Sequence, residues 1–383
     1  MKTCFAIPLF AVLSTTMSTS SHLSGASTGA QQQSYFVYLG SYGQGIQGYR
    51  FDAANGALES IGLAGKVENP SWITADRDYR HLYAVSELQG NQNGGVASFA
   101  IDRKSGKLTS LNQVSSKGKA PCHASVDATG RMIVVANYTT GDAVSFAIEK
   151  NGSLSEAVSI EKAHGSGPNK ERQEGPHAHE AVITRDNTRV YVPDLGLDEI
   201  RIYKIDPATA KLTPNDPPNA KAEAGSGPRH IVFDHNERYA YVMHELKPFV
   251  SVFRRDPATG ALERIQEVRT IRRDFTKENT GAEIRIDAAG KFLYTSNRGE
   301  DSIQVFAIDS ATGKLNQVQN ISTEGQQPRG FALDPTGRFL LAGNQKSNTL
   351  VVFKVDPSTG KLTPAGKKIE TPSPVDVFFV PAS

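Results

Sequence analysis

The sequence predicts an all-β fold, a seven-bladed β-propeller with four antiparallel strands in each blade. A strand–turn–strand pattern recurs at intervals of roughly fifty residues, as in PSWITADRDYRHLYAVSE from Pro70 and GPRHIVFDHNERYAYVMHEL from Gly227. A second turn closes each repeat, as in PATGAL at 257–262 and PSTGKL at 357–362. Short β-rich runs in repeats of this length are typical of propeller blades.

The repeat that begins at Gly227 shows how each blade is built. A Gly-Pro break precedes the apolar run Ile231–Phe233, the polar turn Asp234–Arg238 and a second apolar run, Tyr239–Met243. Two β-rich runs around a tight polar turn indicate a hairpin. The run Val250–Phe253 supplies a third strand, and the closing turn opens a fourth. Each repeat therefore predicts one four-stranded sheet.

The two ends of the chain are expected to share a blade. The sequence has seven closing turns but six complete strand–turn–strand openings. The missing first strand matches Ser373–Val380, whereas the first repeat begins at its second strand, Tyr35–Leu39. We therefore expect the C-terminal strand to join the N-terminal blade and close the ring, which leaves no long sheet edge exposed.

The N-terminal residues are not expected to belong to the propeller, which we place at 35–383. Lys2 precedes a short apolar run and then a region of small residues, a pattern typical of a signal peptide over 1–30. Cleavage is expected after Ala26 or Ala30, with 31–34 as a disordered leader. The protein would then be secreted or periplasmic, or cytoplasmic if this segment is not a signal. Its removal leaves Cys122 alone, so no intramolecular disulfide is expected.

Composition argues against several partners. The net charge is +2, and the Lys and Arg residues are scattered along the chain. No nucleic-acid partner is expected, and no membrane association after removal of the signal. The expected partner is a small molecule, bound by a monomer or weak dimer.

The candidate site emerges when the repeats are aligned on the aspartate of the strand–turn–strand turn. Positions five residues before and eleven after this aspartate lie at the same end of the hairpin, around one mouth of the central channel. We call them the two site columns. A scaffold would repeat similar residues there, but these columns hold charged and polar side chains: Glu87, His179, Arg229, Glu245, Arg298, Arg329 and Gln345.

These residue types point to anion binding and proton transfer. Several guanidiniums at one mouth would bind a carboxylate or phosphate, and an Arg can also stabilise an oxyanion. Glu245 would repel an anionic ligand, so its presence suggests a catalytic or orienting role. His179 is a natural proton carrier near neutral pH. The structural alternative is a ring of Arg–Glu salt bridges that plugs the channel.

Neighbouring residues have simpler interpretations. His177 and His179 fall on one face of a predicted strand and Glu180 follows, but local spacing sets no third ligand, so no metal is expected. A nucleophilic Cys122 would need an adjacent base, so a packed side chain is expected. Strand alternation directs the next position away from the site columns and between the blades, with contacts to the site near the mouth: His123, His230, Glu283 and Asp376. Longer loops at 161–174 and 270–280 are expected to rim the mouth.

Six motifs occur in order along the chain: EGPHAH (174–179), AGSGPRH (224–230), HEL (244–246), TGAEIRI (280–286), SNRG (296–299) and QQPRGFALD (326–334). With them, the chain from about Tyr35 to Val380 resembles the lactonase family of seven-bladed propellers. That family includes propeller-type 6-phosphogluconolactonases and fungal 3-carboxy-cis,cis-muconate lactonising enzymes. Its proposed active site implies catalytic roles for His179, Arg229, Glu245 and Arg298. The residues then expected around the substrate are Arg329, His177, His230, Glu87, Glu283 and Gln345.

The resemblance implies an enzyme without metal or cofactor that hydrolyses the lactone of an anionic sugar acid. The Arg residues would hold the anion, and His179 and Glu245 would form an acid–base pair whose order stays open. One alternative is a cofactor-free cycloisomerase of the carboxymuconate type. Another is a non-catalytic secreted propeller that binds sugars or partners. Because 6-phosphogluconolactone is a cytosolic metabolite, export would favour a different lactone.

Overall fold

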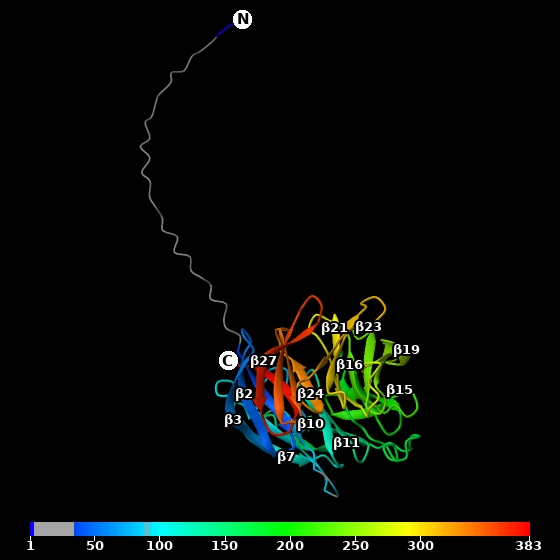
Figure 1. Cartoon of the computed structure of the whole chain (residues 1–383). Helices are drawn as coiled ribbons and strands as arrows, with labels where there is room; N and C mark the ends of the chain where they lie inside the picture. Colours follow the sequence, from blue (N-terminus) through cyan, green and yellow to red (C-terminus); the bar gives the residue numbers. More distant parts are fainter. Residues whose placement is uncertain (4–33, 89, 91) are drawn as a thin grey trace. The chain divides into compact units, whose positions relative to one another are not determined.

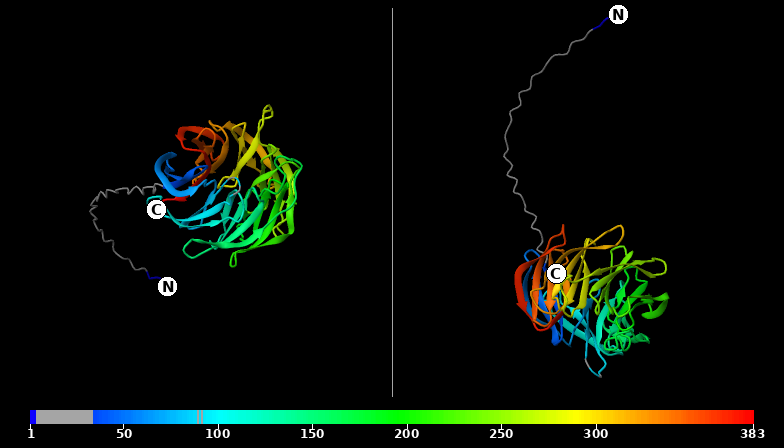
Figure 2. Two further views of the ribbon diagram at one scale, coloured as in Figure 1. Left: turned by 90° about the horizontal axis from the view of Figure 1, so that it is seen from below. Right: turned by 45° about the vertical axis from the view of Figure 1, so that its right-hand side comes forward.

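The computed structural model of the chain describes residues 1–3, 34–88, 90 and 92–383. Both predicted cleavage sites, after Ala26 and Ala30, and the predicted leader up to residue 33 lie outside these residues. Ser34, which was predicted to belong to the leader, is instead the first residue of β1 (Ser34–Ser41). From Ser34 onward the described residues form seven four-stranded antiparallel sheets. The colours run once around the ring of sheets, so that the first and last strands lie side by side (Figures 1 and 2). The predicted seven-bladed propeller is confirmed.

Every sheet uses the same order of strands. The first strand of each blade is β28 (Pro374–Pro381), β4 (Ile73–Ala75), β8 (Pro121–Val126), β12 (Val182–Ile183), β16 (Pro228–Phe233), β20 (Thr280–Ile286) or β24 (Pro328–Leu333). The second is β1 (Ser34–Ser41), β5 (His81–Ser86), β9 (Met132–Asn137), β13 (Arg189–Asp194), β17 (Tyr239–His244), β21 (Phe292–Arg298) or β25 (Phe339–Asn344). The third is β2 (Gln44–Asp52), β6 (Gly95–Ile101), β10 (Asp142–Ile148), β14 (Glu199–Asp206), β18 (Phe249–Arg255), β22 (Ser302–Ile308) or β26 (Thr349–Val355). The fourth is β3 (Ala57–Glu68), β7 (Leu108–Ser115), β11 (Leu154–Glu161), β15 (Lys211–Lys221), β19 (Leu262–Arg269), β23 (Leu315–Ser322) or β27 (Leu362–Glu370).

The hydrophobic core lies between the blades. Second strands such as β9 are buried along their whole length, because blades pack against both of their faces. Outer strands such as β11 alternate between buried or half-buried and exposed residues. Each pair of neighbouring blades shares its own apolar cluster; the cluster between the seventh and first blades, for example, joins Leu341 to Leu39 and Phe379. Stability is thus distributed around the ring, and the axis is left for polar side chains.

A tyrosine on the second strand of several blades is hydrogen-bonded to the closing turn of the next blade. Tyr241 Oη donates to Gly313 O at 3.0 Å, and the same bond recurs at Tyr38, Tyr191 and Tyr294. Gly313 has a φ of 70°, which a residue with a side chain rarely adopts. The turn needs glycine at this position for its backbone conformation. The carbonyl oxygen of that glycine then accepts the hydrogen bond from the tyrosine of the neighbouring blade.

The ends of the chain close the ring as the sequence predicts. Strand β28 pairs antiparallel with β1, with Val37 opposite Phe379 and Leu39 opposite Val377. The Phe379 ring packs edge-on against Phe51, with ring centroids 5.3 Å apart. The first blade therefore contains strands from both ends of the chain.

Several first strands carry a β-bulge at the end that bears the candidate site. In β16, Pro228 pairs with His244 but His230 pairs with Met243, so one extra residue is inserted. The same shift occurs in β8 and β24. A bulge breaks the simple alternation of side chains and re-aims them locally. Consecutive residues of a first strand can therefore both face the axis.

Candidate active site

Glu245 is the centre of the candidate site. It follows β17, is 6% exposed, and both its carboxylate oxygens are paired. Oε2 accepts from Arg229 Nε and lies 3.0 Å from Arg298 Nη2, while Oε1 accepts from Arg172 Nη2. Burial by itself would raise the pKa of Glu245, but Arg298 and Arg229 hold that pKa well below its usual range. Glu245 is therefore an anion at neutral pH.

His179 lies beside this carboxylate, with Nε2 at 3.8 Å from Glu245 Oε2. Its ring packs edge-on against Tyr138, with centroids 5.4 Å apart, and the Cys122 Sγ lies 3.8 Å from Nδ1. Burial and the positive charge of Arg229 hold the pKa of His179 well below its ordinary value. A neutral imidazole therefore faces an anionic carboxylate, which is a suitable arrangement for accepting a proton.

The guanidinium of Arg229 is held in place by the residues next to it. Its Nη1 donates to Ala282 O at 2.7 Å and lies 3.1 Å from His230 Nε2. His230 Nδ1 lies 3.1 Å from Glu283 Oε1, so that carboxylate can hold the proton on Nδ1 and leave Nε2 as an acceptor. This chain of contacts orients the guanidinium toward Glu245.

The residues one position beyond the site column form a second polar layer at the axis. His123 Nε2 lies 3.3 Å from Glu180 Oε1, and Asp376 accepts from the backbone of Ile73. Together with Arg285 they line a cavity of about 590 Å³ whose wall includes residues from all seven first strands. They link neighbouring blades and contact the site near the mouth, as predicted. The simple alternation behind that prediction fails, because the bulge in β16 lets His230 Nε2 lie 3.1 Å from Arg229 Nη1 of the site column.

A second cluster occupies the same mouth. Tyr42 Oη donates to Glu87 Oε1 at 2.9 Å, and the Arg329 guanidinium lies over the Tyr42 ring, 5.4 Å from its centroid. Glu87, Arg229, Arg329 and Glu245 all act electrostatically on the Cys122 thiol, which places Cys122 between the two clusters. Burial raises the pKa of Cys122, so the thiol stays protonated, as expected of a packed side chain.

Together these clusters contain four guanidiniums and two carboxylates: Arg172, Arg229, Arg298, Arg329, Glu87 and Glu245. With His179 neutral, positive charge exceeds negative charge by two. One buried donor, Arg298 Nε, has no hydrogen-bond partner among the described residues. These two clusters therefore hold more positive than negative charge, which is suited to an anion.

Arg172 was not predicted from the sequence. It comes from the loop between β11 and β12, and its Nη2 also lies 3.2 Å from Tyr138 Oη. The expectation that the insertion at 161–174 rims the mouth is confirmed. The second insertion contributes Glu278, which lines a pocket of about 270 Å³ beside Arg298. The only sequence signal for Arg172 was the length of its loop.

The remaining predicted residues lie at the edge of the site. His177 stacks on Tyr138, with centroids 4.7 Å apart, and its Nε2 lies 3.2 Å from Glu174 Oε1. Gln345 follows β25 and donates through its backbone to Gln327 O. The regular strand expected to carry both His177 and His179 is shorter in the structure, where β12 begins at Val182.

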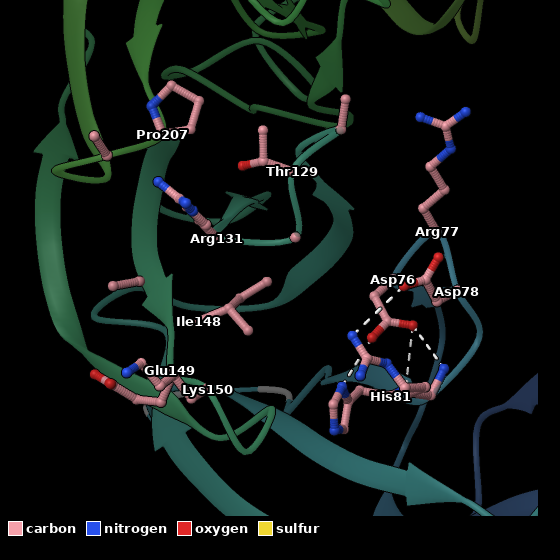
Figure 3. A pocket seen from close by; sticks show the side chains of 15 residues that line it. Asp76, Arg77, Asp78, His81, Thr129, Arg131, Ile148, Glu149, Lys150 and Pro207 are labelled. Carbon is pink, nitrogen blue, oxygen red and sulfur yellow. Dashed lines mark hydrogen bonds and ion pairs between the residues drawn. The ribbon is translucent and has the colours of Figure 1, made fainter.

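Other features of the described residues bear on what the protein can bind. No group of three or more His, Cys, Asp or Glu side chains in that part of the chain has a geometry suited to a metal ion. No helix within the described ranges has the length and apolar character needed to cross a bilayer. A pocket of about 500 Å³ lies at the turn end of the blades, opposite to the site, where Asp76 pairs with His81 and Arg77 extends away (Figure 3).

Comparisons with known proteins agree on one family. Residues 36–379 match the family described as "Lactonase, 7-bladed beta-propeller". The chain is 39% identical over 302 residues to the 6-phosphogluconolactonase of Bacillus subtilis, covering 78% of this chain and 84% of that protein. It is 33% identical over 305 residues to the 6-phosphogluconolactonase of Formosa agariphila, covering 78% and 86%. The periplasmic gluconolactonase of Pseudomonas aeruginosa superimposes with a TM-score of 0.86 at 33% identity, covering 91% of this chain and all of that one.

Proposed function

The chain belongs to the family of seven-bladed β-propeller lactonases, and from this premise we propose that it hydrolyses the lactone of an anionic sugar acid at the cluster around Glu245. The observation that carries the proposal is the excess of guanidinium groups around a neutral His179. Relatives named 6-phosphogluconolactonase support a phosphorylated sugar lactone as substrate. The periplasmic gluconolactonase supports a related lactone outside the cytoplasm.

His179 is the proposed general base. Glu245 is the poorer base, because a proton on it would disrupt its pairs with Arg229 and Arg298 on Oε2. His179 is neutral and therefore able to take a proton from water as the hydroxyl adds to the lactone carbonyl carbon. Glu245, 3.8 Å away, then stabilises the imidazolium that forms. This assigns an order to the acid–base pair that the sequence left open.

Arg298 is the proposed oxyanion donor. The carbonyl oxygen becomes negatively charged when the hydroxyl adds, and a preorganised donor at that point lowers the barrier. The Arg298 side chain is 12% exposed, whereas Arg229 is 3% exposed and is already bonded to Glu245 and Ala282. The ring C–O bond then breaks, and the imidazolium returns its proton to the departing ring oxygen. The product is the open hydroxy acid.

A pH-stat assay tests this function. Purified protein starting at Gln31 is given 6-phosphogluconolactone, unphosphorylated gluconolactone and a carboxylated muconolactone, with and without a chelator. The His179→Ala variant is compared with His164→Ala, which changes an exposed histidine of the loop between β11 and β12. We expect His179→Ala to lower kcat by about 10²- to 10⁴-fold and His164→Ala to match the wild type.

Lactones open spontaneously, so the informative quantity is the difference between wild type and His179→Ala. Equal rates for these two proteins on every lactone would contradict the hydrolase and favour the cycloisomerase or a binding role. Activity lost to the chelator would contradict the metal-free mechanism. The lactone with the largest difference identifies the anion that the site accepts.

A further inference from the structure

Arg172 differs from the other guanidiniums that contact Glu245. The side chain of Arg172 is 39% exposed, against 3% for Arg229 and 12% for Arg298. It belongs to a loop, whereas Arg229 and Arg298 lie on strands β16 and β21. It pairs with Glu245 Oε1, while the other two contact Oε2. Arg172 can therefore leave Glu245 without disturbing the pairs on Oε2.

The backbone that carries Arg172 is held firmly. The adjacent Gln173 is fully buried, its Nε2 donates to Leu195 O at 2.8 Å, and its Oε1 accepts from the backbone of Asn169. The Gln173 backbone also pairs on both sides, with Asn169 O and with the Gly167 N–H. The loop position is thus fixed by buried contacts, and the movable part is the Arg172 side chain itself.

We propose that Arg172 is the residue that selects anionic over neutral lactones, by exchanging Glu245 for the phosphate or carboxylate of the substrate. This inference rests on the proposed function and deepens it. In the free protein Arg172 donates to Glu245 Oε1 and contacts Tyr138 Oη. When an anion enters, the guanidinium turns to it at the mouth, and Glu245 keeps its two partners on Oε2.

Charge makes this exchange favourable for an anionic substrate. Glu245 has three guanidinium partners for one negative charge, so the loss of one leaves it paired. A bidentate guanidinium–phosphate contact supplies charge-assisted hydrogen bonds that are stronger than neutral ones. A lactone without an anionic group offers no such partner, and Arg172 then stays on Glu245. The residue thus contributes to the binding of one substrate class and not to the chemical step.

The test compares Arg172→Met with Arg172→Lys on two substrates that differ in the phosphate group alone. Arg172→Met is expected to raise KM for 6-phosphogluconolactone by about 10- to 100-fold, with kcat changed less than about threefold. Its KM for unphosphorylated gluconolactone should stay within about threefold of wild type. Arg172→Lys keeps the positive charge but lacks the planar guanidinium that binds a phosphate through two hydrogen bonds, so its KM for 6-phosphogluconolactone should be intermediate. Arg77→Met is the matched control, because Arg77 is exposed and lies at the turn end of the blades. Figure 3 shows its side chain extending away from Asp76 and His81.

A binding measurement separates this inference from the proposed function. Calorimetry with glucose 6-phosphate and glucose, which differ in the phosphate group alone and carry no carboxylate, needs no turnover, and it also serves if the wild type hydrolyses neither lactone. We expect the wild type to prefer the phosphorylated sugar by about tenfold or more and Arg172→Met to lose that preference. Equal binding of the two sugars by the wild type, or an undiminished preference in Arg172→Met, would overturn the inference. So would an equal loss of kcat on both lactones, since Arg172 would then serve Glu245 and not the substrate.

Discussion

The protonation state of His179 depends on its surroundings more than on its carboxylate partner. Burial lowers its pKa most, followed by the charges of Arg229 and His230, and the opposing effect of Glu245 is smaller. A histidine with a lowered pKa remains neutral at pH values below the ordinary pKa of a histidine side chain. The excess of guanidiniums that suits an anion thus also keeps the proposed base ready to accept a proton.

This environment predicts where activity is lost in acid. Because the neutral form of His179 persists below its ordinary pKa, the acid limb of kcat/KM in the free enzyme should lie well below pH 6.5. The measurement is initial-rate hydrolysis from pH 4.5 to 8 with unphosphorylated gluconolactone, whose charge stays constant, after subtraction of spontaneous opening. Samples returned to pH 7.5 control for unfolding. An acid limb at pH 6.5 or above would contradict a lowered pKa for His179.

Four of the five residues in the Glu245 cluster could be predicted from the sequence. His179, Arg229, Glu245 and Arg298 occupy equivalent ends of repeating strands, so the repeat itself brings them together. Arg172 could not be predicted, because its position depends on the burial of Gln173 and on a bond to Leu195 O. No periodicity in a Gly- and Pro-rich loop encodes such contacts.

At the level of the strands, the alignment of the blades was predicted correctly from the sequence, whereas the direction of the side chains near the mouth was not. Simple alternation fails where the bulge inserts a residue, and so the side chains of the consecutive residues Arg229 and His230 contact each other, with Arg229 Nη1 at 3.1 Å from His230 Nε2. The sequence did contain a signal. Proline recurs six residues before the turn aspartate, at Pro70, Pro121, Pro228 and Pro328. Because proline cannot donate to the sheet ladder, its place in a strand marks an edge or a bulge.

The bond from tyrosine to the neighbouring turn predicts a difference between two chemically identical changes. Tyr241→Phe removes the donor to Gly313 O and should lower the free energy of unfolding by about 1 kcal/mol. Tyr83 is equally buried, but its hydroxyl has no hydrogen-bond partner among the described residues, so Tyr83→Phe should be close to neutral. Urea unfolding of both variants measures the difference. An equal effect of the two changes would contradict a specific role for this bond.

For the whole molecule, closure of the ring predicts which rearrangements of the chain are tolerated. Ala382 donates to Ser34 O at 3.1 Å, so the two ends of the propeller are neighbours. A circular permutant that starts at Ser373 and joins Ser383 to Ser34 through an Asn-Gly turn keeps every strand pairing. We expect it to match the wild type in circular dichroism, in melting temperature to within a few degrees, and in lactone hydrolysis.

Deletion of 374–383 is the complementary change. It removes β28, whose Val375, Val377 and Val380 are buried, and exposes the pairing edge of β1. We expect the shortened chain to lose its cooperative thermal transition and to aggregate. A truncated protein that melts at the wild-type temperature would show that β28 is not needed to complete the ring.

Because the first blade contains strands from both ends of the chain, it cannot be completed until the whole chain has been synthesised. Strand β1 is among the first parts of the propeller to leave the ribosome, and its partner β28 is the last. At about 5–20 residues per second, the interval between them is roughly twenty seconds to a minute. Throughout that time the inner edge of β1 has no partner from its own chain. The nascent protein therefore depends on translation finishing before that edge meets another strand.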